Sequence, residues 1–434
     1  MRTTKSYKLE NPIKFKEQLF QWSRQAYEVA WLDSNNHYSE AGNFDTLLAI
    51  NAFTAIKTDT YQAFDKFREY QETTKDWIFG YLSYDLKNDV EQLRSRNFDG
   101  LFFPELYFFQ PQKIIQLNGN TAKFHYLRMV DDEMDADFEE ILSLAERGET
   151  IEKRAEEIEI KQRISKESYL QKVENMLSHI QRGDIYEANF CQEFYAENCK
   201  IEPETVFAEL NRISSPPFAT FLKLEQHYLM CASPERYLKK TGNKIISQPI
   251  KGTARRSQNA AEDREIAKML EIDPKEISEN VMIVDLVRND LSKIAQKGSV
   301  KVEELCKVHS FKQVHQLISS ISAELEADIP AVEALRATFP MGSMTGAPKI
   351  SAMKIIEELE ETKRGLYSGA VGYFTPEGDF DFNVVIRSIL YNKENQYLSF
   401  SVGGAITAKS NSEMEYEECL LKAKAMREAL SASS

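Results

Sequence analysis

Residues 368–404, SGAVGYFTPEGDFDFNVVIRSILYNKENQYLSFSVGG, contain three segments rich in Val, Ile, Phe and Tyr that are separated by turn sequences. β-Branched and aromatic residues are enriched in strands, whereas Gly, Pro, Asp and Asn favour the turns between them. The spacing predicts three strands, over 368–374, 382–391 and 397–404. Because short turns connect them, we expect an antiparallel meander.

Two stretches of the sequence predict long helices. Ser165 is a suitable N-cap, Gly183 is a suitable stop, and apolar residues recur between them at helical spacing: Tyr169, Val173, Met176, Leu177 and Ile180. The closing segment 412–430, SEMEYEECLLKAKAMREAL, combines good helix formers with periodic apolar positions. Helices mixed with antiparallel strands predict an α+β fold.

The composition excludes several classes of function. The chain has 434 residues, 42% hydrophobic content and a formal net charge of −14, so it can bury a large core, and its field repels phosphate backbones and anionic lipids. No segment has the continuous apolar length of a membrane span, and we expect no nucleic-acid or membrane partner. Five scattered cysteines, none paired as C-x-x-C, indicate neither a disulfide framework nor a zinc site. Because the N-terminus also lacks a signal-like apolar region, we expect a soluble cytoplasmic protein.

Composition also divides the chain into three parts. Residues 1–130 mix short apolar runs with aromatic, strand-like segments, and they predict a scaffold lobe that is also a candidate regulatory site. Residues 131–164 are rich in acidic and basic side chains, which predicts a solvated connector. Residues 165–434 hold every motif described below and form the predicted catalytic domain.

The segment PIKGTARR (249–256) places Lys251 directly before Gly252 in a short, rigid turn. Such a turn can bring backbone N–H groups near an anion. A lysine must be neutral to attack carbon, so burial, a metal ion or the nearby arginines would have to favour loss of its proton. A basic surface turn is the alternative for this segment taken alone.

Four glutamates lie where acid–base or metal chemistry is predicted. Glu235 follows a proline in the strand-like segment ASPERYL, where burial would raise the pKa of its carboxyl. Glu279 lies on one predicted helix, and Glu415, Glu418 and Lys422 project from one side of the terminal helix. Because magnesium prefers carboxylate oxygens, Glu279 and Glu418 predict an open Mg²⁺ site between two helices. Edge charges and a solvated Glu418–Lys422 pair are the alternatives.

Two further segments carry candidate ligand groups. Arg387 lies in the predicted strand 382–391, where it can clamp a carboxylate or make an ordinary ion pair at a strand edge. MGSMTGAPKISAMKIIEELE (341–360) combines a candidate cap, Thr345, with an amphipathic run, which predicts a helix whose N-terminus suits an anion. His315 falls in an apolar helical pattern and is predicted to be a core histidine.

A series of segments, in this order, resembles the chorismate-utilising enzyme family. This family includes anthranilate synthase component I, aminodeoxychorismate synthase component I, and the isochorismate and salicylate synthases. The resemblance covers residue 165 to the C-terminus, and a looser likeness over 30–35 and 77–86 is to the lobe shared by the two aminating members. The segments are SPERYL (233–238), PIKGT (249–253), ENVMIVDLVRNDLSKI (279–294), GSMTGAPK (342–349), RGLYSGAVGYF (364–374), FNVVIRS (382–388), GGAIT (403–407) and EYEECLLKA (415–423).

This resemblance implies a two-lobed sandwich of largely antiparallel sheets with outer helices, like that of anthranilate synthase component I, with chorismate bound through Mg²⁺ in a cleft between the sheets. By position, Glu279 and Glu418 match the family's magnesium glutamates, with Glu415 beside them. Glu235 matches the acid that assists loss of the ring hydroxyl. The residues that match groups holding the substrate's carboxylates are Gly252, Thr253, Tyr367, Arg387, Gly403, Gly404, Ala405 and Lys422.

Within the family, a lysine at the position of Lys251 is typical of the aminodeoxychorismate-forming members, whereas anthranilate synthases usually carry alanine there. A lysine at this position adds to the ring and is displaced by ammonia, which implies formation of 4-amino-4-deoxychorismate, the precursor of 4-aminobenzoate and folate. Glu187 departs from the pattern, since isochorismate-type enzymes carry a water-activating lysine there and the aminating members commonly carry glutamine. Ala405 replaces a usual glycine. Anthranilate synthase component I and a catalytically silent chorismate-binding relative remain alternatives.

The resemblance also bears on partners and regulation. No cysteine lies in the G-x-C-x-G-like elbow of a glutamine amidotransferase, so a separate amidotransferase subunit is the implied source of ammonia. Residues 32–34 and 217–219 differ from the usual tryptophan pocket of anthranilate synthases. Regulation by tryptophan is therefore not implied.

Overall fold

The computed structural model describes residues 1–37, 44–91, 93–144, 158–311 and 314–432. In these residues, twenty strands belong to one hydrogen-bonded network, and its strand ladders are antiparallel. The network branches at β5 into two sheets. The first sheet runs, in order of pairing, through β1 (Arg2–Lys8), β6 (Thr121–Leu127), β5 (Leu106–Asn118), β3 (Thr46–Thr58), β2 (Glu28–Asp33), β9 (Phe218–Leu224), β10 (His227–Ser233), β19 (Ser388–Asn392), β20 (Tyr397–Thr407) and β8 (Glu187–Ala196), with the short β7 (Lys161–Gln162) and β16 (Gly346–Ala347) on β8.

The second sheet starts from the other end of β5. It runs through β4 (Ile78–Leu82), β17 (Ala370–Phe374), β18 (Phe380–Val384), β11 (Arg236–Thr241), β12 (Lys244–Gln248) and β15 (Val314–Glu324), which also pairs with β13 (Ile250–Arg255) and β14 (Lys301–Ser310).

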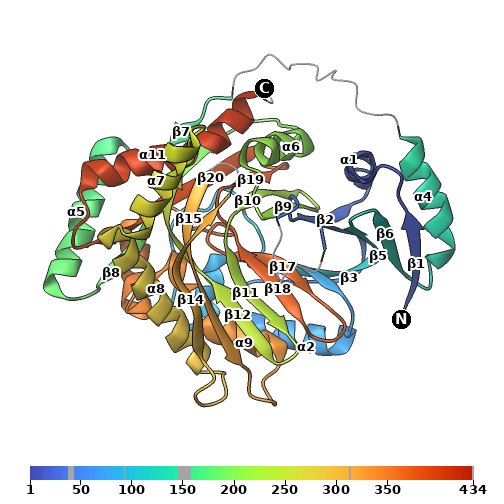
Figure 1. Cartoon of the computed structure of the whole chain (residues 1–434), viewed down its shortest axis with the longest axis horizontal. Coiled ribbons are helices and arrows are strands. Elements are labelled where there is room, and N and C mark those ends of the chain that lie inside the picture. Colours follow the sequence, from blue (N-terminus) through green and yellow to red (C-terminus); the bar gives the residue numbers. More distant parts are fainter. Residues whose placement is uncertain (38–43, 92, 145–157, 312–313, 433–434) are drawn as a thin grey trace.

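Helices lie on the outside of the strands (Figure 1). Their bounds are α1 (Pro12–Ser23), α2 (Ala63–Thr74), α3 (Lys87–Val90), α4 (Met134–Ser143), α5 (Lys166–Arg182), α6 (Pro203–Ser214), α7 (Ala260–Glu271), α8 (Pro274–Ser292), α9 (Ala331–Thr338), α10 (Lys349–Leu359) and α11 (Ser412–Ala432). For the site, α8 and α11 matter most. The first packs against β13 and β15, and the second packs against β20.

The two-residue period of the strands divides the apolar side chains between two cores. On β3, Leu47 and Ala49 enter the core between the two sheets, while Leu48 and Ile50 enter the core between the first sheet and the helices α1, α4, α5, α6, α10 and α11. Burial of apolar surface on both faces is the main force that holds the layers together. The structure therefore confirms the α+β sandwich of antiparallel sheets with outer helices.

Two predicted helices are confirmed. Helix α5 has Ser165 as its N-cap, whose side chain accepts a hydrogen bond from the Ser168 N–H, and it ends at Gly183 with φ +84°. The terminal helix is present as α11. All five cysteines are free thiols. No helix in the described part of the chain is long and apolar enough to cross a membrane.

The predicted strand 382–391 is wrong as a single element. It forms two strands, β18 and β19, which belong to different sheets and do not pair with each other. The chain passes between the sheets at Arg387, whose φ is +51°. This crossing is held by the Val384 N–H donating to the Glu235 carbonyl and by the Ala232 N–H donating to the Arg387 carbonyl. The three-stranded meander is therefore wrong as well.

Two smaller predictions also fail. Thr345 is not a helix cap, because α10 begins at Lys349, and the buried Thr345 hydroxyl donates to the carbonyls of Met341 and Gly342. His315 lies on the strand β15 rather than on a helix. It is nevertheless a core histidine, since it is 2% exposed and its Nε2 lies 3.0 Å from Asp263 Oδ1.

The division into lobes stays a prediction. Within the predicted connector 131–164, the structure forms α4, while residues 145–157 lie outside the described residues. Both cores combine residues from before and after this connector, for example Phe124 with Phe194 in one core and Phe108 with Phe382 in the other.

Candidate active site

A bulge in β13 positions Lys251. Ile250 pairs with Ile318 and Thr253 pairs with Gln316. Two residues of β13 therefore lie opposite one residue of β15 between these pairs. A bulge of this kind re-aims a side chain out of the ladder. Gly252 has φ +87°, where a side chain would be strained, and an added Cβ would lie only 3.1 Å from the Glu276 carboxylate.

Lys251 lies among carboxylates from four separate parts of the fold. Its positive charge acts on Glu187 of β8, Glu235 at the start of β11, Glu276 and Glu279 of α8, and Glu418 of α11. It makes no ion pair within 4.0 Å with any described residue. The ammonium group is thus held near several carboxylates without being fixed by one of them.

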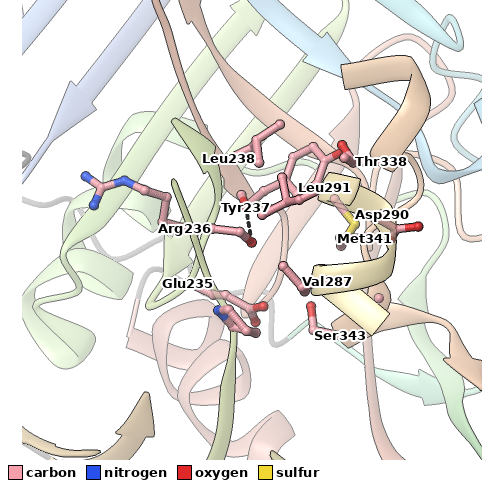
Figure 2. Close-up of a pocket in the computed structure, with 13 residues that line it drawn as sticks. Glu235, Arg236, Tyr237, Leu238, Val287, Asp290, Leu291, Thr338, Met341 and Ser343 are labelled. Carbon is pink, nitrogen blue, oxygen red and sulfur yellow. Dashed lines mark hydrogen bonds between the residues drawn. The ribbon is translucent and has the colours of Figure 1, made fainter. Parts of the chain in front are cut away.

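Glu235 is a buried acid beside Lys251. It is 4% exposed, and burial raises the pKa of its carboxyl to about 7, against the opposing effects of a hydrogen bond from the Ser343 side chain, the charge of Lys251 and a hydrogen bond from the Ile250 backbone. Figure 2 shows the Glu235 carboxylate directed toward Ser343, while Arg236 points to the other side of the strand. A carboxyl with this pKa can hold and release a proton near neutral pH.

Glu279 of α8 is buried and incompletely paired. It is 7% exposed, and its Oε1 makes no hydrogen bond. Burial raises the pKa of its carboxyl to about 7, and the charges of Glu276 and Glu187 act in the same direction against Lys251 and Lys275. Lys275 Nζ lies 3.9 Å from this oxygen, one helical turn away.

The first turns of α11 bring two more glutamates to the same place. Glu415 is 4% exposed, and its Oε1 lies 3.6 Å from Lys275 Nζ. Glu418 Oε1 lies 2.7 Å from Lys422 Nζ. Partial burial opposes ionisation of Glu418, but Lys422, Lys275 and Lys251 together hold the pKa of its carboxyl below its usual range. The glutamates of α8 and α11 therefore share one acidic cluster with lysines at its edges.

The donors of this cluster suit a hard divalent cation. In the described ranges, no group of three His, Cys, Asp or Glu side chains is already arranged to hold a metal ion. However, the buried Glu279 Oε1 makes no hydrogen bond with the described residues, and the positive charge of Lys275 lies 3.9 Å from it and 3.6 Å from Glu415 Oε1. Carboxylates with a free oxygen fit Mg²⁺. The residues present therefore fit the predicted metal.

The strand β20 forms the wall beside the acidic cluster. A Cβ added to Gly404 would lie 3.3 Å from Glu415 Oε2, 3.7 Å from Glu418 Oε1 and 3.7 Å from Lys422 Nζ. Lys422 Nζ also donates to the Gly403 carbonyl at 2.8 Å. The backbone of Gly403 and Gly404 thus lies directly against the charged side chains of α11.

Arg387 and Tyr367 lie on another side of the site. Two backbone hydrogen bonds, from the Ala232 N–H to the Arg387 carbonyl and from the Val384 N–H to the Glu235 carbonyl, hold the chain at Arg387 close to the segment that carries Glu235. Its guanidinium makes no hydrogen bond or ion pair with the described side chains, and burial lowers its pKa. The Tyr367 hydroxyl lies 3.6 Å from Cys191 Sγ, and Cys191 pairs with Gly403. Among the predicted ligand groups, Thr253 and Glu418 are exposed to solvent.

Three participants were missed in the sequence. Lys275 and Glu276 join the acidic cluster, and Ser343 binds Glu235. Lys275 lies four positions before Glu279, so the i,i+4 spacing was a visible signal. Ser343 lies more than 100 positions from Glu235 in the sequence, and local pattern cannot reveal such a contact.

Comparison with known proteins agrees with this geometry. The family described as chorismate binding enzyme matches residues 22–428. Aminodeoxychorismate synthase component 1 of Bacillus subtilis (strain 168) is 30% identical over 405 residues, which cover 90% of this chain and 83% of the relative. The probable chloroplastic aminodeoxychorismate synthase of Oryza sativa subsp. japonica is 40% identical over 264 residues, which cover 60% of this chain but only 29% of the relative.

A solved structure has the same fold. Anthranilate synthase component I from Streptococcus pneumoniae TIGR4 superposes with a TM-score of 0.77 at 25% identity, over 90% of this chain and 94% of that one. The chain therefore belongs to the chorismate binding enzyme family.

Proposed function

We propose that this chain aminates chorismate to 4-amino-4-deoxychorismate. The observation that carries the proposal is the placement of Lys251, which the β13 bulge turns toward a buried acid, Glu235, and the acidic cluster. Relatives named aminodeoxychorismate synthase support the same reaction.

Chorismate carries two carboxylates, and the site offers cationic and N–H groups for both. The Arg387 guanidinium has no partner among the described side chains, and such a group can bind a carboxylate through two parallel hydrogen bonds. The N–H groups of Gly252 and Thr253 in the bulge, those of Gly403, Gly404 and Ala405, the Tyr367 hydroxyl and Lys422 are the other proposed carboxylate ligands. These contacts orient the ring between Lys251 and Glu235.

The proposed reaction has two steps. Neutral Lys251 forms a bond from Nζ to a ring carbon, the ring double bonds shift, and the C–O bond to the ring hydroxyl breaks while Glu235 gives its proton to the leaving oxygen. Ammonia then bonds to the carbon that carried the hydroxyl, the double bonds shift back, and the electrons of the Lys251 C–N bond return to Nζ. Glu235 is suited to the first step because its raised pKa keeps a protonated fraction at neutral pH.

Glu279 and Glu418, with Glu415 beside them, are the proposed Mg²⁺ ligands. When bound, the cation would supply positive charge to a substrate carboxylate. Lys275 would have to give up its contacts with Glu279 and Glu415 as the metal takes them over.

Ammonia is proposed to come from a separate glutamine amidotransferase, because the sequence contains no nucleophilic cysteine elbow. The product would then serve synthesis of 4-aminobenzoate and folate in the cytoplasm. In the absence of that partner, activity should depend on added ammonium.

Product identification tests the proposal. Purified protein is incubated with chorismate, Mg²⁺ and ammonium at alkaline pH. The products are separated by chromatography and identified by mass spectrometry. We expect 4-amino-4-deoxychorismate. Anthranilate with release of pyruvate would instead support the alternative function, anthranilate synthase component I, which the structural match also favours. No turnover would indicate a catalytically silent chorismate-binding protein.

A further inference from the structure

Glu187 is a buried carboxylate to which the proposed reaction has not yet given a role. It is the first residue of β8, it is 2% exposed, and its Oε2 makes no hydrogen bond within the described ranges of the chain. A buried charged oxygen without a partner is costly. Its Oε2 can therefore accept a hydrogen bond from a bound donor or cation, which none of the described residues supplies.

The neighbours of Glu187 in the sheet cannot neutralise it. It pairs with Thr407 of β20 on one side and Ala347 of β16 on the other, and neither residue titrates. Helix α10 also packs on β8, but its Lys349 is bound to Asp290 at 2.5 Å. The strands on both sides also fix the backbone of Glu187, so its carboxylate cannot easily turn away.

Two charged groups act on Glu187 from across the site. Lys251 of β13 attracts it, and Glu279 of α8 repels it. Lys251 is shared with four other carboxylates, and it must be neutral when it attacks the ring. When Lys251 is neutral, its positive charge no longer balances Glu187 and the other carboxylates, and the site has an excess of negative charge. A small cation with N–H donors would then bind favourably to Glu187.

Building on the proposed amination of chorismate, we propose that Glu187 binds an ammonium ion and accepts one of its protons. The proton passes from nitrogen to a Glu187 carboxylate oxygen, which leaves neutral ammonia and a carboxylic acid, with no change in oxidation state. The freed lone pair on ammonia then forms the C–N bond to the ring as the bond to Lys251 breaks. Burial raises the pKa of Glu187, which makes it a stronger base.

Glutamine at this position would be nearly the same size but could neither attract a cation nor accept its proton. The sequence therefore departs from the common aminating pattern in a way that changes the accepted form of the nucleophile. With Glu187, the more abundant ammonium ion becomes usable near neutral pH. Without it, only the small fraction of free ammonia would react.

The test compares wild type with Glu187→Gln in steady-state formation of 4-amino-4-deoxychorismate, with total ammonium varied at several pH values between 7 and 10 and without an amidotransferase. At pH 7 we expect the KM for total ammonium to rise about tenfold or more, the size of one lost hydrogen bond between charged groups. At pH 10, where free ammonia dominates, the two proteins should have similar KM values. Glu187→Asp should restore part of the difference.

Glu197→Gln is the matched control, because it makes the same change just beyond the other end of β8 at an exposed residue. It should leave the ammonium dependence unchanged. Equal KM values for wild type and Glu187→Gln at pH 7, or the same ratio at every pH, would overturn the inference. A wild type that forms no 4-amino-4-deoxychorismate would instead overturn the proposed function.

Discussion

Lys275 Nζ of α8 lies 3.6 Å from Glu415 Oε1 of α11. A cation on one helix thus holds an acidic side chain of another, at the point where the proposed Mg²⁺ would bind. The same nitrogen lies 3.9 Å from Glu279 Oε1. The Lys275 ammonium group would therefore compete with the proposed Mg²⁺ for the same carboxylates.

Lys275→Met should increase the affinity for Mg²⁺, because the metal no longer has to displace an ammonium group. We expect the dissociation constant to fall by about threefold to tenfold, consistent with the small net worth of partly exposed ion pairs. Isothermal titration with MgCl₂ in the absence of substrate measures the change.

Lys166→Met serves as the control for this change, since Lys166 pairs at 2.7 Å with Glu413, an exposed residue on the same helix α11. This control should leave the Mg²⁺ affinity close to that of wild type. Weaker Mg²⁺ binding in Lys275→Met would mean that Lys275 assists the metal rather than competing with it.

Glu235 should give the activity a limb that falls as pH rises. A general acid works only while protonated, and the pKa of Glu235 is about 7, so its contribution to kcat/KM should decrease above that pH. Glu235→Gln should lower kcat by about 10²–10⁴-fold and remove this limb. A pH profile of kcat/KM at saturating ammonia measures both effects, and an unchanged limb in the variant would assign it to another group.

The same substitution should stabilise the folded protein at pH 8. The folded-state pKa of about 7 lies above the ordinary value of 4.5, so the folded protein binds this proton more tightly and loses stability as pH rises through that interval. Replacing the buried charge by an amide should recover on the order of 2 kcal/mol at pH 8 and almost nothing at pH 4. Urea unfolding at both pH values checks this, and an equal effect at the two would contradict it.

Arg387→Gln should weaken chorismate binding. The loss of a charged, bidentate hydrogen bond costs about 1.5–3 kcal/mol, or roughly a 10–100-fold higher KM for chorismate. Arg255→Gln, which removes an exposed arginine paired with Glu262, is the control and should keep the wild-type KM. If the two variants have the same KM, Arg387 does not hold the substrate.

Much of this site could be predicted from the sequence because short motifs carry it. Glu279 on its helix and the Glu418–Lys422 pair at i,i+4 lie where the sequence placed them, whereas Lys251 and Gly252 lie at a bulge of strand β13 rather than in the predicted turn. Each of these features depends on a chain segment of fewer than ten residues, in which the spacing of residues along the sequence determines which side chains lie next to one another.

The remaining features depend on contacts between distant segments. The segment 382–391 has the composition of one strand, yet it crosses between two sheets because hydrogen bonds from residues 232–235 fix the chain at Arg387. Likewise, Lys275 acquires its role from Glu415, which lies 140 positions further along the chain. Tertiary packing, rather than local propensity, decides such features.

The role of Lys251 can be tested most directly by intact-protein mass spectrometry after mixing the enzyme with chorismate and Mg²⁺ in the absence of ammonium. Wild type should gain the mass of chorismate less one water, with the adduct on Lys251, and added ammonium should release it as 4-amino-4-deoxychorismate. Lys251→Ala should show no adduct and lose activity on the order of 10³-fold or more. Full activity of Lys251→Ala, or an adduct on another residue, would contradict the assignment of Lys251 as the nucleophile.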